Sequence, residues 1–169
     1  MIKNYNEIHV LNNSLVILDL DETIIRFPYI TGLWWENTKK AYELIDVKTS
    51  NDRTYSDWLY IVNTYNPSIL DNLEFNNLLM RIKNTNSTFI IVTARNIKLK
   101  HITEKHLNTC GINCDVYYST NKGITINEIK YNYIYKHVIF VDDNPKYIKQ
   151  VEELNPEIIT YFIKHENLI

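Results

Sequence analysis

Cysteine is scarce in this sequence, which has only two such residues, Cys110 and Cys114. A structural zinc site needs about four ligands, and no second Cys/His pair lies at a suitable spacing. We therefore expect reduced, partly buried thiols. None of the five histidines lies beside a Ser or Cys nucleophile, so we expect structural or surface roles for them.

Basic residues are not in excess either, because 18 Lys and Arg stand against 20 Asp and Glu, for a net charge of −2. The chain therefore offers no large basic field, and charge does not indicate a nucleic-acid partner. No apolar run approaches the roughly 20 residues of a membrane helix. The first six residues lack the apolar core of a signal peptide. A cytoplasmic protein without a membrane partner is the default expectation.

What the sequence does contain is typical of one globular domain. The 169 residues are 45% hydrophobic and 22% charged, which suits a single domain over 1–169 with a full core. We find no repeat, low-complexity tract or linker that would divide the chain.

Apolar runs alternate with amphipathic stretches along most of the sequence. Such alternation predicts an α/β fold, a three-layer sandwich with a mostly parallel, doubly wound sheet. A further short strand is possible near 8–11. The predicted core strands are 15–20, 88–92, 115–118, 137–141 and 158–163, and the predicted helices between them are 72–84, 97–109, 124–135 and 145–154.

Residues 27–70 interrupt this alternation after the first strand and are expected to form a small, mainly helical, cap-like insertion. Helices are predicted at 36–46 and 55–65, with a polar loop at 48–53 between them. Four aromatic residues there are candidates for substrate contact: Trp34, Trp35, Trp58 and Tyr60. Helical spacing favours a packing role for Trp58, whereas adjacent aromatic residues do not share a face of a helix or strand.

The stretch 15–25 carries the clearest chemical signal. Its apolar run reads as a buried strand and leads directly into Asp19, Asp21 and Thr23. Residues two apart on an extended chain point the same way, so the two carboxylates can converge beyond the end of the strand. Crowded carboxylates repel each other unless a cation or a shared proton lies between them. A surface turn or helix cap is the alternative reading.

Polar residues follow three other predicted strands: Thr93, Lys122, and the pair Asp142 and Asp143. In a parallel sheet the carboxyl ends share one edge, where ligands bind. Carboxylates at two strand ends, a hydroxyl and an ammonium suit Mg²⁺ beside a phosphoryl group.

These motifs, in this order, resemble those of the haloacid dehalogenase-like (HAD) superfamily. The first motif is the sequence Asp-Leu-Asp-Glu-Thr over 19–23, and the resemblance covers roughly residues 15–150. It implies a Mg²⁺-dependent phosphatase with Asp19 as the nucleophile that forms an aspartyl-phosphate. Asp21 is implied as general acid and base, with its backbone carbonyl on the metal. The dehalogenase branch does not place an acid/base Asp there.

The resemblance also implies roles for the later motifs. Thr93 and Lys122 would hold phosphoryl oxygens, and Asp19 and Asp142 would bind the metal through their carboxylates. Asp143 would be a direct metal ligand or would act through a water molecule or through Lys122. Capping the next helix is the alternative for Thr93.

Neighbouring residues leave further alternatives open. Lys98 and Lys100 compete with Lys122 for the cationic role. Asn144 reads as a helix N-cap before Pro145, and Arg95 as either a substrate contact or a salt-bridge partner.

Other function classes fit less well. A phospho-accepting receiver domain combines similar residues, but its acidic pair follows the first strand rather than the fourth. A catalytically idle binding domain is possible, although every expected position is filled. For the substrate, a small phosphomonoester or nucleotide ranks first, a polynucleotide end or phosphoprotein second, and phosphotransfer to a sugar third. The first motif resembles phosphatases of the RNA polymerase tail, whereas the later motifs resemble small-molecule and nucleotide phosphatases.

Overall fold

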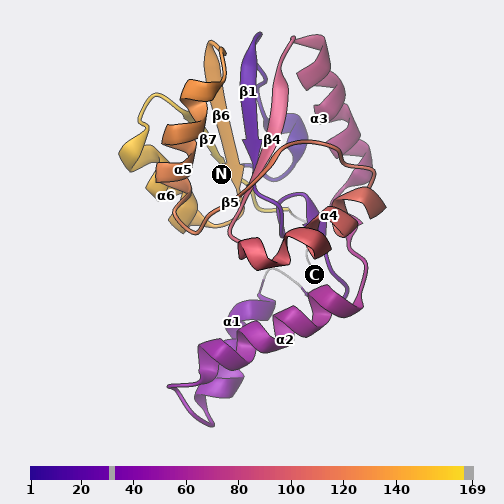
Figure 1. Cartoon of the computed structure of the whole chain (residues 1–169), viewed down its shortest axis with the longest axis vertical. Helices are drawn as coiled ribbons and strands as arrows, with labels where there is room; N and C mark the ends of the chain where they lie inside the picture. Colours follow the sequence, from indigo (N-terminus) through magenta and orange to yellow (C-terminus); the bar gives the residue numbers. More distant parts are fainter. Residues whose placement is uncertain (31–32, 166–169) are drawn as a thin grey trace.

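The computed structural model describes residues 1–30 and 33–165 and contains a five-stranded parallel sheet (Figure 1). The strands lie in the order β5-β4-β1-β6-β7. Their bounds are β1 Ser14–Leu18, β4 Thr88–Thr93, β5 Val116–Tyr118, β6 His137–Asp142 and β7 Ile159–Phe162.

Strand β1 lies at the centre of the sheet, and all five of its residues are buried. It pairs with a strand on each side, so that Leu18 lies opposite Ile91 of β4 and Val141 of β6. This register brings the segments that follow β1, β4 and β6 to one edge of the sheet.

Helices cover both faces of the sheet, which confirms the predicted α/β class and its layers. Alternate β1 residues divide the core: Val16 and Leu18 pack with α3 (Asn72–Asn84) and α4 (Lys100–Thr109). Leu15 and Ile17 pack on the other face with α5 (Lys122–Ile129) and α6 (Pro145–Leu154). This two-sided burial explains why the strand is apolar without alternation.

Local signals place several of the helix ends. The Asp71 side chain accepts a hydrogen bond from the Glu74 amide at the start of α3. Gly111, just after α4, has φ of +68°, a conformation that favours glycine. Asn144 caps α6 through the Lys146 amide, as predicted.

Two predictions of secondary structure were wrong. Residues 8–11 form no strand; they follow a 3₁₀ helix, η1 (Tyr5–Glu7), and Ile8 enters the core from irregular chain. The helix predicted over 124–135 begins earlier, because the Asn121 side chain caps it, and ends at Ile129, where the 3₁₀ helix η3 (Lys130–Asn132) follows. Another short 3₁₀ helix, η2 (Ile97–Leu99), precedes α4 at the start of the helix predicted over 97–109.

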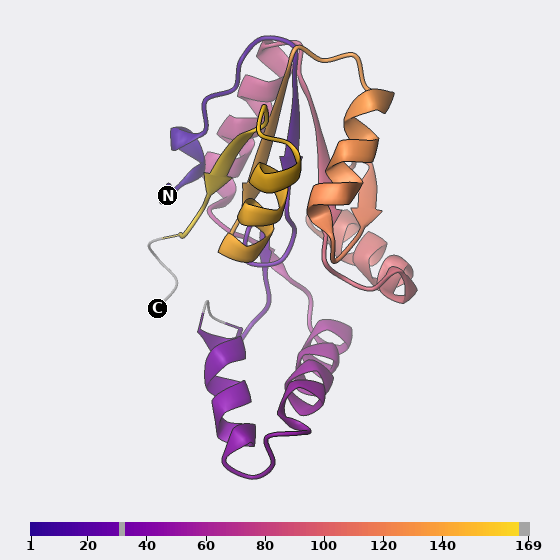
Figure 2. The ribbon, with the colours of Figure 1, turned by 90° about the vertical axis from the view of Figure 1, so that its left-hand side faces the viewer.

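The insertion contains two helices, α1 (Trp34–Glu43) and α2 (Ser50–Thr64). They form a hairpin that lies beyond the carboxyl ends of the strands (Figures 1 and 2). At its base, β2 (Ile25–Arg26) pairs antiparallel with β3 (Ser68–Ile69). Residues 31–32 of the predicted insertion lie outside the described residues.

The loop predicted over 48–53 lies earlier in the chain, at 44–49, because α1 ends at Glu43 and α2 begins at Ser50. The Asp46 carboxylate accepts hydrogen bonds from the Lys48 amide and the Thr49 hydroxyl, which closes a tight turn. Helix α2 therefore begins at Ser50, five residues before its predicted start.

Among the described residues, no helix combines the length and apolar character needed to cross a membrane. Cys110 and Cys114 are free thiols of intermediate burial, as predicted.

Candidate functional site

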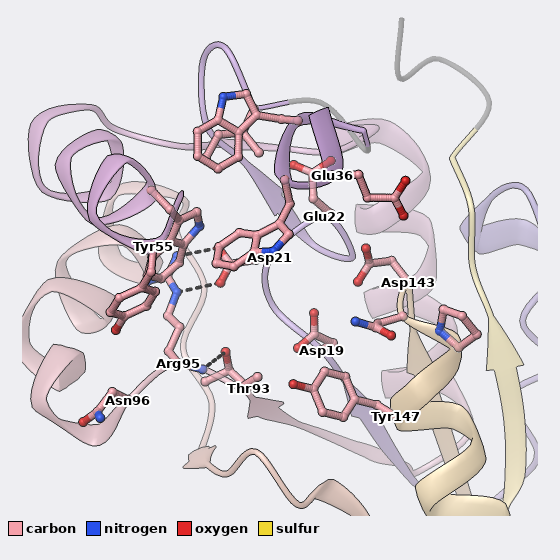
Figure 3. Close-up of a pocket in the computed structure, with 17 residues that line it drawn as sticks. Asp19, Asp21, Glu22, Glu36, Tyr55, Thr93, Arg95, Asn96, Asp143 and Tyr147 are labelled. Atoms are coloured by element: carbon pink, nitrogen blue, oxygen red, sulfur yellow. Dashed lines mark hydrogen bonds and ion pairs between the residues drawn. The ribbon is translucent and has the colours of Figure 1, made fainter. Parts of the chain in front are cut away.

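A cavity of about 590 Å³ opens between the carboxyl edge of the sheet and the helical hairpin (Figure 3). The loops after β1, β4 and β6 supply its floor, and α1 and α2 supply the opposite wall. Asp19, Thr93 and Asp143 line it, so the structure brings together residues from three of the four predicted motifs.

Three carboxylates converge at this edge. One carboxylate oxygen from each of Asp19, Asp142 and Asp143 lies within 4.8 Å of the others. Asp19 and Asp142 are buried, with 6% and 0% of their surfaces exposed. An all-oxygen donor set of this kind fits a hard divalent cation such as Mg²⁺ or Ca²⁺ and does not by itself select between them.

The ammonium group of Lys122, the third motif along the chain, lies against two of these carboxylates. Its Nζ donates to Asp19 Oδ1 and, at 2.7 Å, to Asp142 Oδ2, and the side chain is fully buried. The Tyr147 ring centroid is 4.5 Å from Nζ. Because α5 begins at Lys122, the first turn of this helix carries the lysine into the site.

Backbone groups join the first and last motifs. The Asp143 amide donates to Thr23 Oγ1 at 3.0 Å, and the Asn144 amide donates to Asp142 Oδ1 at 2.8 Å. The Asp19 amide donates to the Val141 carbonyl at 2.9 Å. These bonds hold the loops after β1 and β6 in one arrangement.

The electrostatics of the cluster favour added positive charge. Burial raises the pKa of Asp19, although Lys122 opposes that shift. Burial and the neighbouring Asp19 charge raise the pKa of both Asp142 and Asp143. Burial alone would lower the pKa of Lys122, but Asp19 and Asp142 outweigh it and keep the ammonium charged. A divalent cation would relieve the repulsion among the carboxylates.

Asp21 lines the same cavity, but its carboxylate lies outside the acidic cluster. It forms a two-point ion pair with Arg95, with Nε–Oδ2 and Nη2–Oδ1 distances of 2.7 and 2.6 Å (Figure 3). Arg95 is therefore a salt-bridge partner, one of its two predicted roles. Metal binding by Asp21 was expected through its backbone carbonyl and stays a prediction.

Arg95 also connects the site to α4. Its Nη1 donates to Thr103 Oγ1 at 3.1 Å and lies 3.2 Å from His106 Nδ1. Its guanidinium carbon lies 5.8 Å from the Trp58 ring centroid and 5.6 Å from that of Phe27. The same arginine thus contacts Asp21 at the carboxyl edge of the sheet, the base of the insertion and the second helix of the insertion.

Thr93 is buried at the end of β4, and its hydroxyl accepts a hydrogen bond from the Arg95 amide at 3.2 Å. The side chain therefore caps the local turn while it lines the cavity. Of the lysines, Lys122 reaches the carboxylates, whereas Lys98 and Lys100 do not line the cavity.

Of the four aromatic residues that were candidates for substrate contact, three line the cavity and one does not. Trp34, Trp35 and Trp58 line the cavity, whereas Tyr60 is 65% exposed and does not.

Sequence reasoning assigned no site role to several lining residues, among them Glu22, Glu36, Tyr55 and Tyr147. Tyr55 lies three residues before Trp58, a helical spacing that places both on one face, and this signal was available. Tyr147 follows the Asp142–Asp143 pair by one helical turn. No local pattern marks Glu36, because its position depends on how the hairpin folds over the sheet.

Comparisons of this chain with known protein families, with curated proteins and with solved structures found no match.

Proposed function

We propose that this protein is a Mg²⁺-dependent phosphatase of the HAD type that hydrolyses a phosphomonoester. The observation that carries the proposal is the convergence of Asp19, Asp142 and Asp143 around one point, with Lys122 bonded to the first two. Charge neutralisation and positioning are the main contributions that phosphoryl transfer asks of a protein.

The donor set fits Mg²⁺. Asp19 and Asp142 would bind it through carboxylate oxygens, Asp143 directly or through water, and Asp21 through its carbonyl. When bound, the ion would supply positive charge at the phosphoryl oxygens.

Asp19 would act as the nucleophile. A bond forms between an Asp19 carboxylate oxygen and phosphorus while the ester P–O bond breaks, and the departing oxygen takes up a proton. Water then attacks phosphorus, the bond to Asp19 breaks, and inorganic phosphate leaves with Asp19 restored. Lys122 is bonded to Asp19 and would keep that carboxylate ionised and oriented for the attack.

Asp21 would give the proton to the departing oxygen and take one from water. Both oxygens of its carboxylate accept hydrogen bonds from the Arg95 guanidinium. A proton transfer by Asp21 therefore requires this ion pair to loosen during the reaction.

The test is hydrolysis of p-nitrophenyl phosphate with Mg²⁺ by the wild-type protein and by Asp19→Asn. The substitution keeps the shape of the side chain but removes the nucleophilic charge. We expect the rate to fall by at least about 10³-fold. Asp52→Asn, at an exposed position of α2 outside the cavity, is the matched control and should keep the wild-type rate. Equal rates for wild type and Asp19→Asn would refute the proposal.

A further inference from the structure

An aromatic wall faces the acidic cluster across the cavity. It consists of Trp34 and Trp35 at the start of α1, and Tyr55 and Trp58 on α2. The Tyr55 and Trp58 rings are stacked, with centroids 5.6 Å apart and an interplanar angle of 19°. The two tryptophan rings of α1 meet edge to face, with centroids 6.3 Å apart.

Core packing does not account for this wall. Trp35 and Tyr55 are 40% and 39% exposed, and none of the residues of α1, Trp34–Glu43, is buried. Trp34 and Trp58 touch the edge of the core while still lining the cavity. Large aromatic faces that stay open beside a site with converging polar groups are typical of ligand pockets.

The charge of the cavity restricts what else the ligand can carry. Five carboxylates line it: Asp19, Asp21, Glu22, Glu36 and Asp143. Among the described residues lining the cavity, Arg95 is the only lysine or arginine, and it is already paired with Asp21. A divalent cation at the acidic cluster would hold one phosphoryl group. The described lining residues offer no further lysine or arginine that would hold a second phosphate or an acidic peptide.

We infer that the leaving group is a nucleoside, so that the substrate is a nucleoside monophosphate whose base stacks on the aromatic wall. This inference rests on the proposed function. The bond broken is the one between phosphorus and the nucleoside ester oxygen, which leaves as the alcohol of the nucleoside. Stacking against aromatic side chains suits any base, because each has a π-face. A sugar phosphate has no aromatic base that could stack on the same wall. The carboxylates of the cavity disfavour the repeated phosphates of a polynucleotide.

Binding can be tested separately from catalysis, because the chain has three tryptophans and all of them line this cavity. Asp19→Asn is titrated with adenosine 5′-monophosphate and with ribose 5-phosphate in Mg²⁺, and tryptophan fluorescence is measured. The two probes share the phosphate and the sugar and differ by the base. We expect saturable quenching by the nucleotide and little change with ribose 5-phosphate. Equal responses to both probes, or no response to either, would overturn the inference.

The kinetic test uses wild type, Trp35→Ala and Trp35→Phe with the same two substrates. Loss of the exposed ring should lower kcat/KM for the nucleotide about tenfold, and Phe should restore most of it. The low value for ribose 5-phosphate should not change. Tyr60→Ala, on α2 but outside the cavity, is the matched control and should match wild type.

These measurements distinguish failure of the nucleoside inference from failure of the proposed phosphatase function. If wild type hydrolyses p-nitrophenyl phosphate and also ribose 5-phosphate as fast as the nucleotide, the phosphatase stands and the nucleoside inference falls. A higher kcat/KM for a 5′-phosphorylated oligonucleotide than for the mononucleotide would also overturn it. If no phosphate ester is hydrolysed, the proposed function fails, and the fluorescence titration still decides whether the cavity binds a nucleotide.

Discussion

The central sheet and the helical hairpin are built on different principles. Every residue of β1 is buried, whereas none of the residues of α1 is, and α2 buries only Ser50, Thr54 and Val62. The strands of the sheet therefore supply more buried apolar surface to the fold than the two helices of the hairpin do. The hairpin instead supplies side chains to the cavity and contributes few buried residues to the core.

The ion pairs of the two regions differ in the same sense. Lys122 is fully buried between Asp19 and Asp142, whereas Lys39 and Glu43 of α1 form an exposed pair with an N–O distance of 3.5 Å. Exposed pairs contribute about 0–1 kcal/mol, while removal of one partner from a buried pair is costly. The comparison predicts that stability depends on the sheet edge and not on the hairpin.

The largest effect is expected from Lys122→Met. Removing the ammonium leaves Asp19 and Asp142 buried without their shared partner. We expect the free energy of unfolding to fall by about 3–5 kcal/mol, measured by urea denaturation without Mg²⁺. Lys39→Met is the control in the hairpin and should cost less than about 1 kcal/mol. Similar losses of unfolding free energy in Lys122→Met and Lys39→Met would show that stability does not depend more on the sheet edge than on the hairpin.

A smaller loss is expected from Gly123→Ala. A Cβ at this position would lie 2.3 Å from the backbone oxygen of Gln150, so α5 could no longer approach α6 as closely. We expect a loss of about 1–3 kcal/mol in thermal or urea unfolding, together with reduced activity because Lys122 is the adjacent residue. Glu128→Ala, at an exposed position of the same helix, should change stability by no more than about 0.5 kcal/mol. A Gly123→Ala protein as stable as that control would show that the contact is not tight.

A pH-dependent effect is expected from His106, which lies where the two regions meet. Burial, and next the Arg95 charge, lower its pKa to about 4, with Asp21 opposing and Lys105 adding slightly to the shift. The ring also packs edge to face on Phe27. The unfolded chain, with an ordinary pKa near 6.5, then binds a proton that the fold does not.

Stability should therefore fall as the pH drops from about 6.5 to about 4, and this contribution should be constant above and below that range. His106→Gln should show a shallower fall over the same interval in unfolding experiments at several pH values. An unchanged slope would mean that the ring is protonated in the folded protein.

Sequence patterns were sufficient for the sheet and insufficient for the hairpin, for a physical reason. Buried strands such as β1 need continuous apolar runs, and the ends of parallel strands meet at one edge. The order of these runs along the chain is therefore enough to predict that Asp19, Asp142 and Lys122 meet. The start of α2 could not be predicted in this way, because the Asp46 turn replaces a loop that the polar composition of 48–53 favoured.

The pairing of Asp21 with Arg95 illustrates a second limit. The spacing of Asp19 and Asp21 predicts that both carboxylates point the same way, but the chain leaves the extended conformation just after β1, and Glu22 has φ of +59°. The Asp21 side chain consequently pairs with Arg95, which itself contacts α4, and lies outside the acidic cluster. Long-range contacts of this kind depend on the packing of α4, which local spacing does not report.

The proposed activity requires a single divalent-cation site assembled from separate strand ends. Calorimetric titration of Mg²⁺ into the wild-type protein and into Asp142→Asn, without substrate, tests it. We predict binding of one ion by the wild type and loss of that binding in Asp142→Asn, which removes a buried carboxylate of the cluster. Equal Mg²⁺ binding by the two proteins, or none by the wild type at millimolar concentrations, would contradict the account.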